Sequence, residues 1–416
     1  MPRITKFPPF GKRFFRRARK LVGRCHFEHF WRAVCAIASL HGRRSIQRLR
    51  DLLGGYRTRQ AIASFLNHAT WNAPGLLRET ALDTLQRLGY RPGDTVYVVL
   101  DDTQKRKRGK VMAAVSKIFL HAEKAFAKGH TVLGCALLYR GVLIPYAVRL
   151  WATPECCAGT QAEPDPEDRV PFRKLTALGA EVVQGVTLPA GARAVVLFDS
   201  YYLCAAVVTA CQARRWPFVS VAKKNRNFAP DGRRRDKRKL GPYGRNVLDR
   251  CGRRCEVGGK EHRLAERVGW LSKVGRVKLV FSRRPRERSW VVLVTDQTRW
   301  GMRTVLSHYL LRWPIELLFK ASKQYLGLGD YQVLRYRGVV RYLHLVLIAY
   351  LLLTHLAICG PGAQADVSGR GELRLPSIPE LQERLRGLLW DSILTDLGKR
   401  KQTRAAAKKL REAVML

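Results

Sequence analysis

The chain of 416 residues has few acidic residues: 32 Asp and Glu stand against 77 Lys and Arg, which gives a net charge of +45. A charge of this size repels itself in a compact state and requires a polyanionic partner. The basic residues are spread along the whole chain and do not gather beside one amphipathic helix. This distribution favours nucleic acid, bound through its phosphates, over an anionic membrane surface.

The ten cysteines lack the regular spacing of a disulfide framework, so we expect them to be reduced and the protein to be intracellular. Cys251 and Cys255, with His262 nearby, suggest zinc ligands. The three-residue gap between the cysteines and the lack of a matching second pair argue against a zinc site. The arginines of the first 24 residues are not followed by a small-residue cleavage site, so we expect no secretory signal.

One apolar run, over residues 339–359, is long enough to span a bilayer. Arg341, His344 and His355 interrupt it, and ionisable side chains inside a membrane are costly. We therefore expect a buried core helix and no association with a membrane.

Residues 1–90 are predicted to form a basic arm and a helical DNA-binding domain. The arm covers the first 24 residues, and we expect it to be disordered. Helical spacing and capping residues predict four helices, over residues 28–40, 45–53, 58–67 and 73–88. Short helices joined by the turn at Gly54 and Gly55 are typical of a helix-turn-helix DNA reader, and equally of a plain helical bundle.

The pattern changes after Asp94. Residues 95–100 are β-branched and aromatic and predict a buried strand that ends at Asp101, Asp102 and Thr103, before a very basic loop. A second buried strand is closed by Asp199. Between the two, we expect strands over residues 131–139 and 142–150, and a helix that begins at 164–168 and ends near 186.

The stretch 309–323 holds Tyr309, Arg312, Glu316 and Lys323, which fall within about 60° of one another on a helix. By itself this pattern also describes the solvated face of an amphipathic helix. Pro314 either begins that helix, which places Glu316 in its first turn, or kinks a longer one.

The spacing of these four residues resembles the Tyr-Arg-Glu-Lys signature of bacterial insertion-sequence transposases of the DDE class. The resemblance implies an α/β fold: a ribonuclease H-like mixed sheet flanked by helices, in which the strands before Asp101 and Asp199 are neighbours. It also implies a catalytic core made of residues 91–221 and 301–359, a β-strand-rich insertion at 222–300, and a linker with a basic helical C-terminal region at 360–416.

By the same resemblance, Asp101, Asp199 and Glu316 are the catalytic residues and hold two divalent cations, Mg²⁺ with Mn²⁺ as a substitute. The Asp-x-Ser/Thr pattern of the family selects Asp101, and Asp102 is the alternative in register. The residues assigned to DNA contacts are Tyr309, Arg312, Lys323, Trp300, Arg106, Lys107 and Arg108. Trp313 is a further candidate for stacking on a base, although we expect it to pack in the core.

These expectations describe a DNA transposase that excises and inserts an insertion-sequence element by metal-dependent strand cleavage and strand transfer. Its partners are the terminal repeats of the element and the target DNA, which a homodimer would bind in the bacterial cytoplasm, associated with the nucleoid. Two alternatives remain: a catalytically silent DNA-binding descendant of such an enzyme, and a metal-dependent DNA nuclease.

Overall fold

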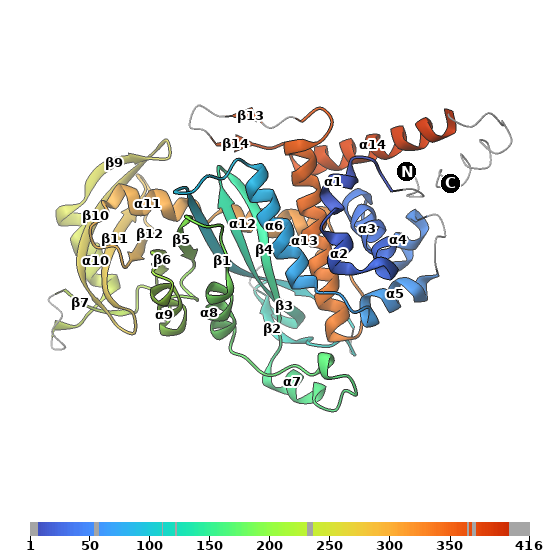
Figure 1. Ribbon diagram of the computed structural model, residues 1–416. Coiled ribbons are helices and arrows are strands. Elements are labelled where there is room, and N and C mark those ends of the chain that lie inside the picture. Colours follow the sequence, from blue (N-terminus) through green and yellow to red (C-terminus); the bar gives the residue numbers. More distant parts are fainter. Residues whose placement is uncertain are drawn as a thin grey trace.

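A mixed sheet runs through the centre of the molecule in the computed structural model (Figure 1). The structure describes residues 7–53, 58–109, 111–120, 123–230, 236–363, 366–367 and 372–398. Twelve described strands form the sheet in the order β2-β3-β1-β5-β6-β12-β11-β10-β7-β8, with β4 paired to β3 and β9 paired to β10. Helices flank it, which confirms the predicted α/β class.

The part of the sheet around β1 has three antiparallel strands followed by two parallel ones. β1 pairs with β3 and β3 with β4 in antiparallel register, while β5 lies parallel to β1 and β6 parallel to β5. The bounds are β1 Thr95–Arg106, β2 Ser116–Leu120, β3 Ala125–Tyr139, β4 Val142–Trp151, β5 Arg193–Phe198 and β6 Phe218–Ala222. The predicted neighbourhood of β1 and β5 is therefore confirmed.

Three helices follow the strands of this part: α7 (Pro154–Thr160), α8 (Leu175–Gly185) and α9 (Ala205–Ala213). The predicted start of α8 near residues 164–168 is wrong, since only a short 3₁₀ turn (η1, Pro166–Asp168) forms there. Pro171 lies between this turn and α8, and a proline disfavours helical backbone in the residue before it. The helix therefore begins beyond the proline.

The N-terminal helices are α1 Gly11–Phe15, α2 Ala18–Val22, α3 Arg24–Ser39, α4 Ile46–Leu52, α5 Arg59–His68 and α6 Ala73–Arg87. The side chains of Ser45, Thr58 and Asn72 each accept a hydrogen bond from a backbone N–H of the helix that follows, as N-caps do. The predicted disordered arm is wrong from residue 7 onward, because α1 and α2 bury Phe15 and Val22. Residues 1–6 lie outside the described residues.

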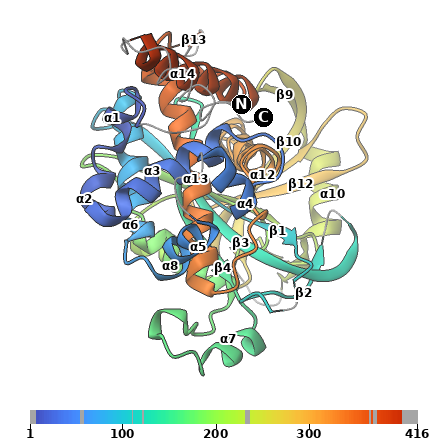
Figure 2. The same cartoon turned by 90° about the vertical axis from the view of Figure 1, so that its right-hand side faces the viewer.

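The apolar run forms α13 (Tyr336–Cys359), a helix with the sheet and α6 on one side and helices α1–α5 on the other (Figures 1 and 2). It is long and apolar enough to cross a membrane, yet most of its apolar stretch is buried inside the protein, mainly by α3, α6 and β4. The interrupting Arg341 is buried and donates to the Leu66 carbonyl at 2.9 Å. The prediction of a buried core helix is confirmed.

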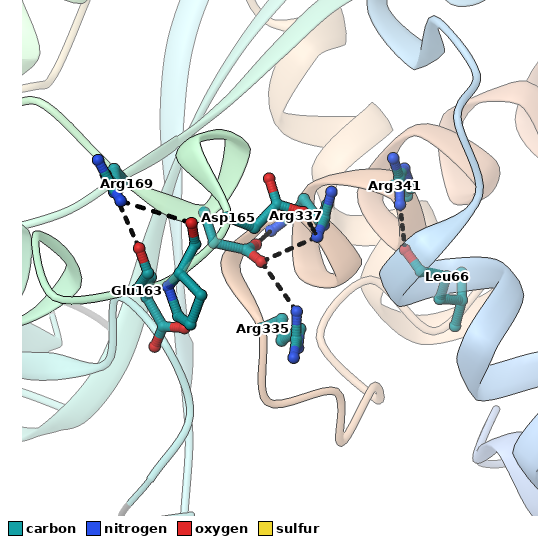
Figure 3. Close-up of polar contacts among 9 residues, drawn as sticks. Leu66, Glu163, Asp165, Arg169, Arg335, Arg337 and Arg341 are labelled. Atoms are coloured by element: carbon teal, nitrogen blue, oxygen red, sulfur yellow. Dashed lines mark hydrogen bonds and ion pairs between the residues drawn. The ribbon is translucent and has the colours of Figure 1, made fainter.

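The start of α13 also holds the segment that contains α7 and η1 (Figure 3). Arg337 bonds to Asp165, and its guanidinium lies 3.2 Å from the buried carboxylate of Asp168. Arg335 approaches the same Asp168 carboxylate at 3.4 Å. These ion pairs hold the segment between β4 and α8 against the start of α13.

The predicted insertion continues the sheet on the left of Figure 1. Its elements are β7 Asn227–Ala229, β8 Arg238–Lys239, α10 Leu240–Cys251, β9 Arg253–Val257, β10 Lys260–Leu271, β11 Gly275–Arg283 and β12 Trp290–Thr295. β12 pairs antiparallel with β6, so the chain returns from this region into the main sheet. Here Arg267 donates to the sulfur of Cys251, while His262, which lies opposite Cys255 on the neighbouring strand, bonds to Ser282.

The last described elements are β13 (Asp366–Val367), β14 (Leu373–Arg374) and α14 (Ile378–Gly398). Gln382 of α14 donates to the carbonyl of Ala38 at the end of α3 and to that of Tyr325. The C-terminal helix therefore joins the N-terminal helices to the region that follows β12. The basic segment predicted at the C-terminus, residues 399–416, lies outside the described residues.

Candidate active site

Two aspartates lie at matching positions, directly after the last parallel pair of β1 and β5. Leu100 of β1 pairs with Phe198 of β5, so the next residues are Asp101 and Asp199. Side chains at the carboxyl ends of adjacent parallel strands meet at one edge of a sheet, where α/β proteins commonly place their sites. Burial raises the pKa of the Asp101 carboxyl, and the charge of Asp199 adds to that rise.

The end of β1 differs from the prediction. The strand does not stop at Asp101 but continues to Arg106, because residues 101–106 pair with residues 129–134 of β3. Of the residues predicted to form a basic loop, 104–106 therefore belong to the strand. Asp101 lies within a paired strand, opposite Gly134, and this backbone holds its side chain on one face of the sheet.

The glutamate comes from a helix that packs on that same face. α11 (Met302–Leu310) ends before a three-residue turn, and α12 (Pro314–Tyr325) begins at the proline with Glu316 in its first turn. Of the two alternatives, Pro314 as the first helical residue is the one observed. The four residues of the Tyr-Arg-Glu-Lys pattern therefore do not share one continuous helix: Tyr309 belongs to α11, Arg312 to the turn, and Glu316 and Lys323 to α12.

Arg312 joins the carboxylates of the two elements. One terminal nitrogen donates to Asp101 Oδ2 at 2.7 Å and the other to Glu316 Oε1. Both Arg312 and Asp101 are largely buried, whereas the side chain of Glu316 is 37% exposed. A guanidinium with its two nitrogens on two carboxylates fixes the separation of β1 and α12 at the site.

Burial raises the pKa of the Asp101 carboxyl to about 7, against the lowering effect of Arg312, and the charges of Asp199 and Asp102 raise it further. Burial tends to lower the pKa of the Arg312 guanidinium, but Tyr309, Asp101 and Glu316 outweigh it and raise that pKa overall. Carboxylates crowded in a buried place are unstable as anions unless a cation compensates them. Strong pKa perturbation of this kind is typical of functional sites.

A comparison with known protein families identifies the family of the chain. The sequence model of the DDE superfamily endonuclease family matches residues 26–268, more than half of the chain. The chain belongs to the DDE superfamily endonucleases. Membership implies an enzyme of the nuclease or transposase type that acts on DNA. The matched residues include Asp101 and Asp199 and end before Glu316. No curated protein matches the chain.

In this DDE endonuclease, Asp102 faces away from Asp101, as successive strand residues do. Its Oδ1 accepts a hydrogen bond at 2.9 Å from the hydroxyl of Tyr202, which is fully buried. Burial raises the pKa of this tyrosine, and the nearby charge of Asp102 raises it further. Sequence reasoning missed Tyr202; its position three residues after Asp199 was the available signal.

The remaining residues of the Tyr-Arg-Glu-Lys pattern surround the carboxylates. The Tyr309 ring lies 5.8 Å from the centre of the Arg312 guanidinium and is partly buried. Burial lowers the pKa of the Lys323 ammonium, and so does the neighbouring Lys105, while Asp102 opposes them. Lys323 therefore lies close to the continuation of β1 beyond the aspartates.

Arg106, Lys107 and Arg108 lie at the end of β1 and just beyond it, and they differ in exposure. Lys107 is buried, and its ammonium donates to the carbonyls of Gly329 and Tyr331 at 2.7 and 3.1 Å, over the Tyr331 ring. Burial lowers its pKa to about 7. In this structure the Lys107 ammonium is thus occupied by protein carbonyls, and its contact with DNA stays a prediction. Arg106, which pairs with Glu123, and Arg108 are exposed.

The two tryptophans are placed differently. The Trp300 ring packs against His308 with centroids 4.7 Å apart, and its carbonyl accepts from Lys278 at 2.6 Å. Trp313 is 57% exposed at the start of α12, so the prediction that it packs in the core is wrong. Leu310 at the end of α11 and Leu317 in α12 are exposed as well.

Members of this superfamily typically use divalent metals, and the side chains here can be tested against that use. Asp101, Asp199 and Glu316 offer the hard oxygen donors that Mg²⁺ and Mn²⁺ prefer. Within the part of the chain that the structure describes, no three His, Cys, Asp or Glu side chains approach closely enough to hold a metal ion. The positive guanidinium of Arg312 stands between Asp101 and Glu316. The three carboxylates are therefore suitable ligands for a divalent cation. In this structure the guanidinium of Arg312 neutralises two of them, Asp101 and Glu316.

Proposed function

We propose that this DDE endonuclease is a transposase of the insertion-sequence group with the Tyr-Arg-Glu-Lys signature, which excises and inserts its element by DNA cleavage and strand transfer. The observation that carries the proposal is the Arg312 bridge between Asp101 and Glu316, beside Asp199 on the adjacent strand. It joins the strand pair inside the family match to the helix outside it, and this supports the assignment of the third carboxylate to the same site.

In the proposed reaction, Asp101, Asp199 and Glu316 hold the divalent cations, and Asp102 is oriented away by Tyr202. The cations supply charge that activates the attacking oxygen and stabilises the leaving oxygen of an in-line phosphoryl displacement. Water is the first nucleophile and frees a 3′-OH at the end of the element. That hydroxyl then attacks the target DNA, and no covalent bond to the protein forms.

Arg312, Tyr309 and Lys323 are the residues we assign to phosphate oxygens near the cleaved bond. The guanidinium of Arg312 and the ammonium of Lys323 form charge-assisted hydrogen bonds to phosphate, and the Tyr309 hydroxyl donates one more. Once the carboxylates were neutralised by the cations that they would hold, Arg312 would be free for this role. The exposed Trp313 and the half-buried Trp300 are the candidates for stacking on an unpaired base.

We further propose the division into residues 1–90 for DNA binding, 91–221 and 301–359 for catalysis, 222–300 as an insertion, and 360–416 as a linker and basic C-terminal region. A homodimer that pairs two element ends in the cytoplasm completes the proposal. The net charge of +45 supports extensive DNA contact.

The test is cleavage of duplex DNA that carries the native flanks of the gene, with Mg²⁺ or Mn²⁺, by the wild type beside Asp199→Asn. Nicking at one defined position that requires metal and is lost in the variant supports the proposal. Joining of the cleaved end to a second DNA separates a transposase from a simple nuclease. Tight, salt-sensitive binding without cleavage would indicate the silent DNA-binding descendant instead.

A further inference from the structure

The hairpin of β2 and β3 carries an unusual pair of cross-strand contacts. Lys117 lies opposite Lys128, and Phe119 lies opposite Phe126. Residues directly opposite each other in an antiparallel pair point to the same side, as do residues two apart on one strand. One face of the hairpin therefore presents two lysines and two phenylalanines, which we call the Lys-Phe face. The alternate residues Ile118 and Leu120 are buried on the other side.

The Lys-Phe face is exposed at a cost to folding. Phe126 is 66% and Phe119 37% exposed, and both lysines are exposed. Like charges directly opposite each other destabilise a strand pair. Among the described residues, no carboxylate lies within ion-pair distance of either lysine, and Lys117 is instead 5.7 Å from the Phe126 ring. Glu123, at the tip, pairs with Arg106.

Protection of an edge strand does not account for this composition. β2 is at the end of the sheet, where lysines discourage pairing with another chain, but an exposed phenylalanine pair has the opposite effect. A ligand that offers both negative charge and flat apolar surface matches the composition of this face. Duplex DNA has this chemistry, and its major groove is wide enough to admit a two-stranded β-ribbon.

The register of β3 gives the distance between the Lys-Phe face and Asp101. Asp101 is paired with Gly134, and Lys128 and Phe126 lie six and eight residues further along β3. At 3.4 Å per residue they are about 20 and 27 Å from the site. DNA rises about 3.4 Å per base pair, so this span corresponds to about six to eight base pairs. In Figure 2 the hairpin of β2 and β3 lies at the margin of the molecule, away from the N-terminal helices.

We propose that the Lys-Phe face binds the major groove of duplex DNA about six to eight base pairs from the cleaved phosphate. Lys117 and Lys128 neutralise phosphates on the two sides of the groove, and Phe119 and Phe126 contact base edges within it. The location relative to the cleaved phosphate rests on the proposed function, whereas the binding itself does not.

The test uses the full-length protein in EDTA and a fluorescein-labelled duplex that carries the native gene flanks. Lys117→Gln/Lys128→Gln is compared with Lys174→Gln/Lys260→Gln, a pair of exposed lysines elsewhere that loses the same charge. Loss of two phosphate contacts makes the slope of log K against log salt shallower by about 1.8. The control pair is expected to keep the wild-type slope. Phe119→Ala/Phe126→Ala is expected to weaken binding by about fivefold or more at constant salt.

A truncation series tests the position. On duplexes that end about four base pairs from the cleavage point, the lysine variant and the wild type are expected to bind equally, because the groove in question is missing. An unchanged slope for Lys117→Gln/Lys128→Gln on the long duplex would overturn the proposal, as would a loss of self-association in sedimentation without any change in DNA binding. Failure of the wild type to cleave would contradict the proposed function and leave the salt-slope result standing.

Discussion

Arg312 donates to the Asp101 carboxylate at 2.7 Å and thereby ties the turn before α12 to strand β1. The same guanidinium bonds to Glu316. In the proposed enzyme, this arginine has two successive partners: carboxylates when no metal is bound, and phosphate oxygens when cations have taken its place.

Arg312→Ala is expected to make the protein less stable without metal and more responsive to metal. Removing the guanidinium leaves Asp101 and Glu316 without their counter-charge, at a cost of about 3–5 kcal/mol for a broken buried pair. A divalent cation then compensates them, so the rise in melting temperature on adding Mg²⁺ should be larger in the variant than in the wild type. Calorimetry with and without Mg²⁺ measures both effects. Equal Mg²⁺-induced shifts would show that Arg312 does not compete with metal.

Glu316→Gln is expected to abolish strand cleavage and to leave DNA affinity almost unchanged. The amide keeps the shape of the side chain but loses the charge that the proposed cations require. Glu256→Gln, at an exposed position on β9, removes the same charge elsewhere and is the control for net charge. Cleavage and binding of the same duplex are measured side by side. Cleavage by Glu316→Gln at the wild-type rate would remove Glu316 from the site.

Lys107 and Arg108 are adjacent in sequence and are expected to behave oppositely on substitution. Lys107→Gln loses two hydrogen bonds to the backbone of the segment after α12, so it should lower stability without changing the salt dependence of DNA binding. Arg108 is exposed, and Arg108→Gln should make the salt slope shallower by about 0.9 if the arginine neutralises one phosphate. Denaturant titration and salt-dependent binding of both variants check this. A shallower slope for Lys107→Gln would mean that its buried position is not kept on DNA.

Stability is expected to fall as the pH is lowered through the range from 6.5 to about 4. Burial lowers the pKa of His130, His344 and His355 from 6.5 to about 4 each. The unfolded chain takes up these protons near pH 6.5, whereas the folded protein resists them, so each histidine costs about 1.4 kcal/mol per pH unit in this window.

Urea unfolding at several pH values measures this loss. His344→Leu should reduce the dependence on pH between 6.5 and 4, because the buried group that resists protonation is gone. His68→Leu, at an exposed position, is the comparison. A free energy of unfolding that is constant from pH 7 to 5 in the wild type would contradict the assignment of these buried histidines.

Local signals in the sequence predicted where many helices and strands begin, but not which strands pair with one another. Ser45, Thr58 and Asn72 begin helices because a cap bonds to its own helix, and the strands before Asp101 and Asp199 have the composition of buried strands. The continuation of β1 to Arg106 depends on β3, which lies more than twenty residues away in the chain. No local pattern carries that pairing.

The site shows the same division. The spacing of Glu316 after Arg312 is visible in the sequence, but the bond from Arg312 to Asp101 joins residues 211 positions apart. Lys107 looks like one more member of a basic run, and only the carbonyls of Gly329 and Tyr331 reveal that it is buried. Phe15 and Val22 likewise become core residues only because other helices cover them.

The most direct measurement of the central claim is cleavage of the protein backbone by Fe²⁺ and ascorbate, with the fragments mapped by mass spectrometry. Fe²⁺ can occupy a site made for Mg²⁺, and the radicals it generates cut the chain near its ligands. We expect cuts close to Asp101, Asp199 and Glu316, all three suppressed by excess Mg²⁺ and lost together in Asp199→Asn. Cuts at only one of these places, or cuts that Mg²⁺ does not suppress, would contradict a shared cation site.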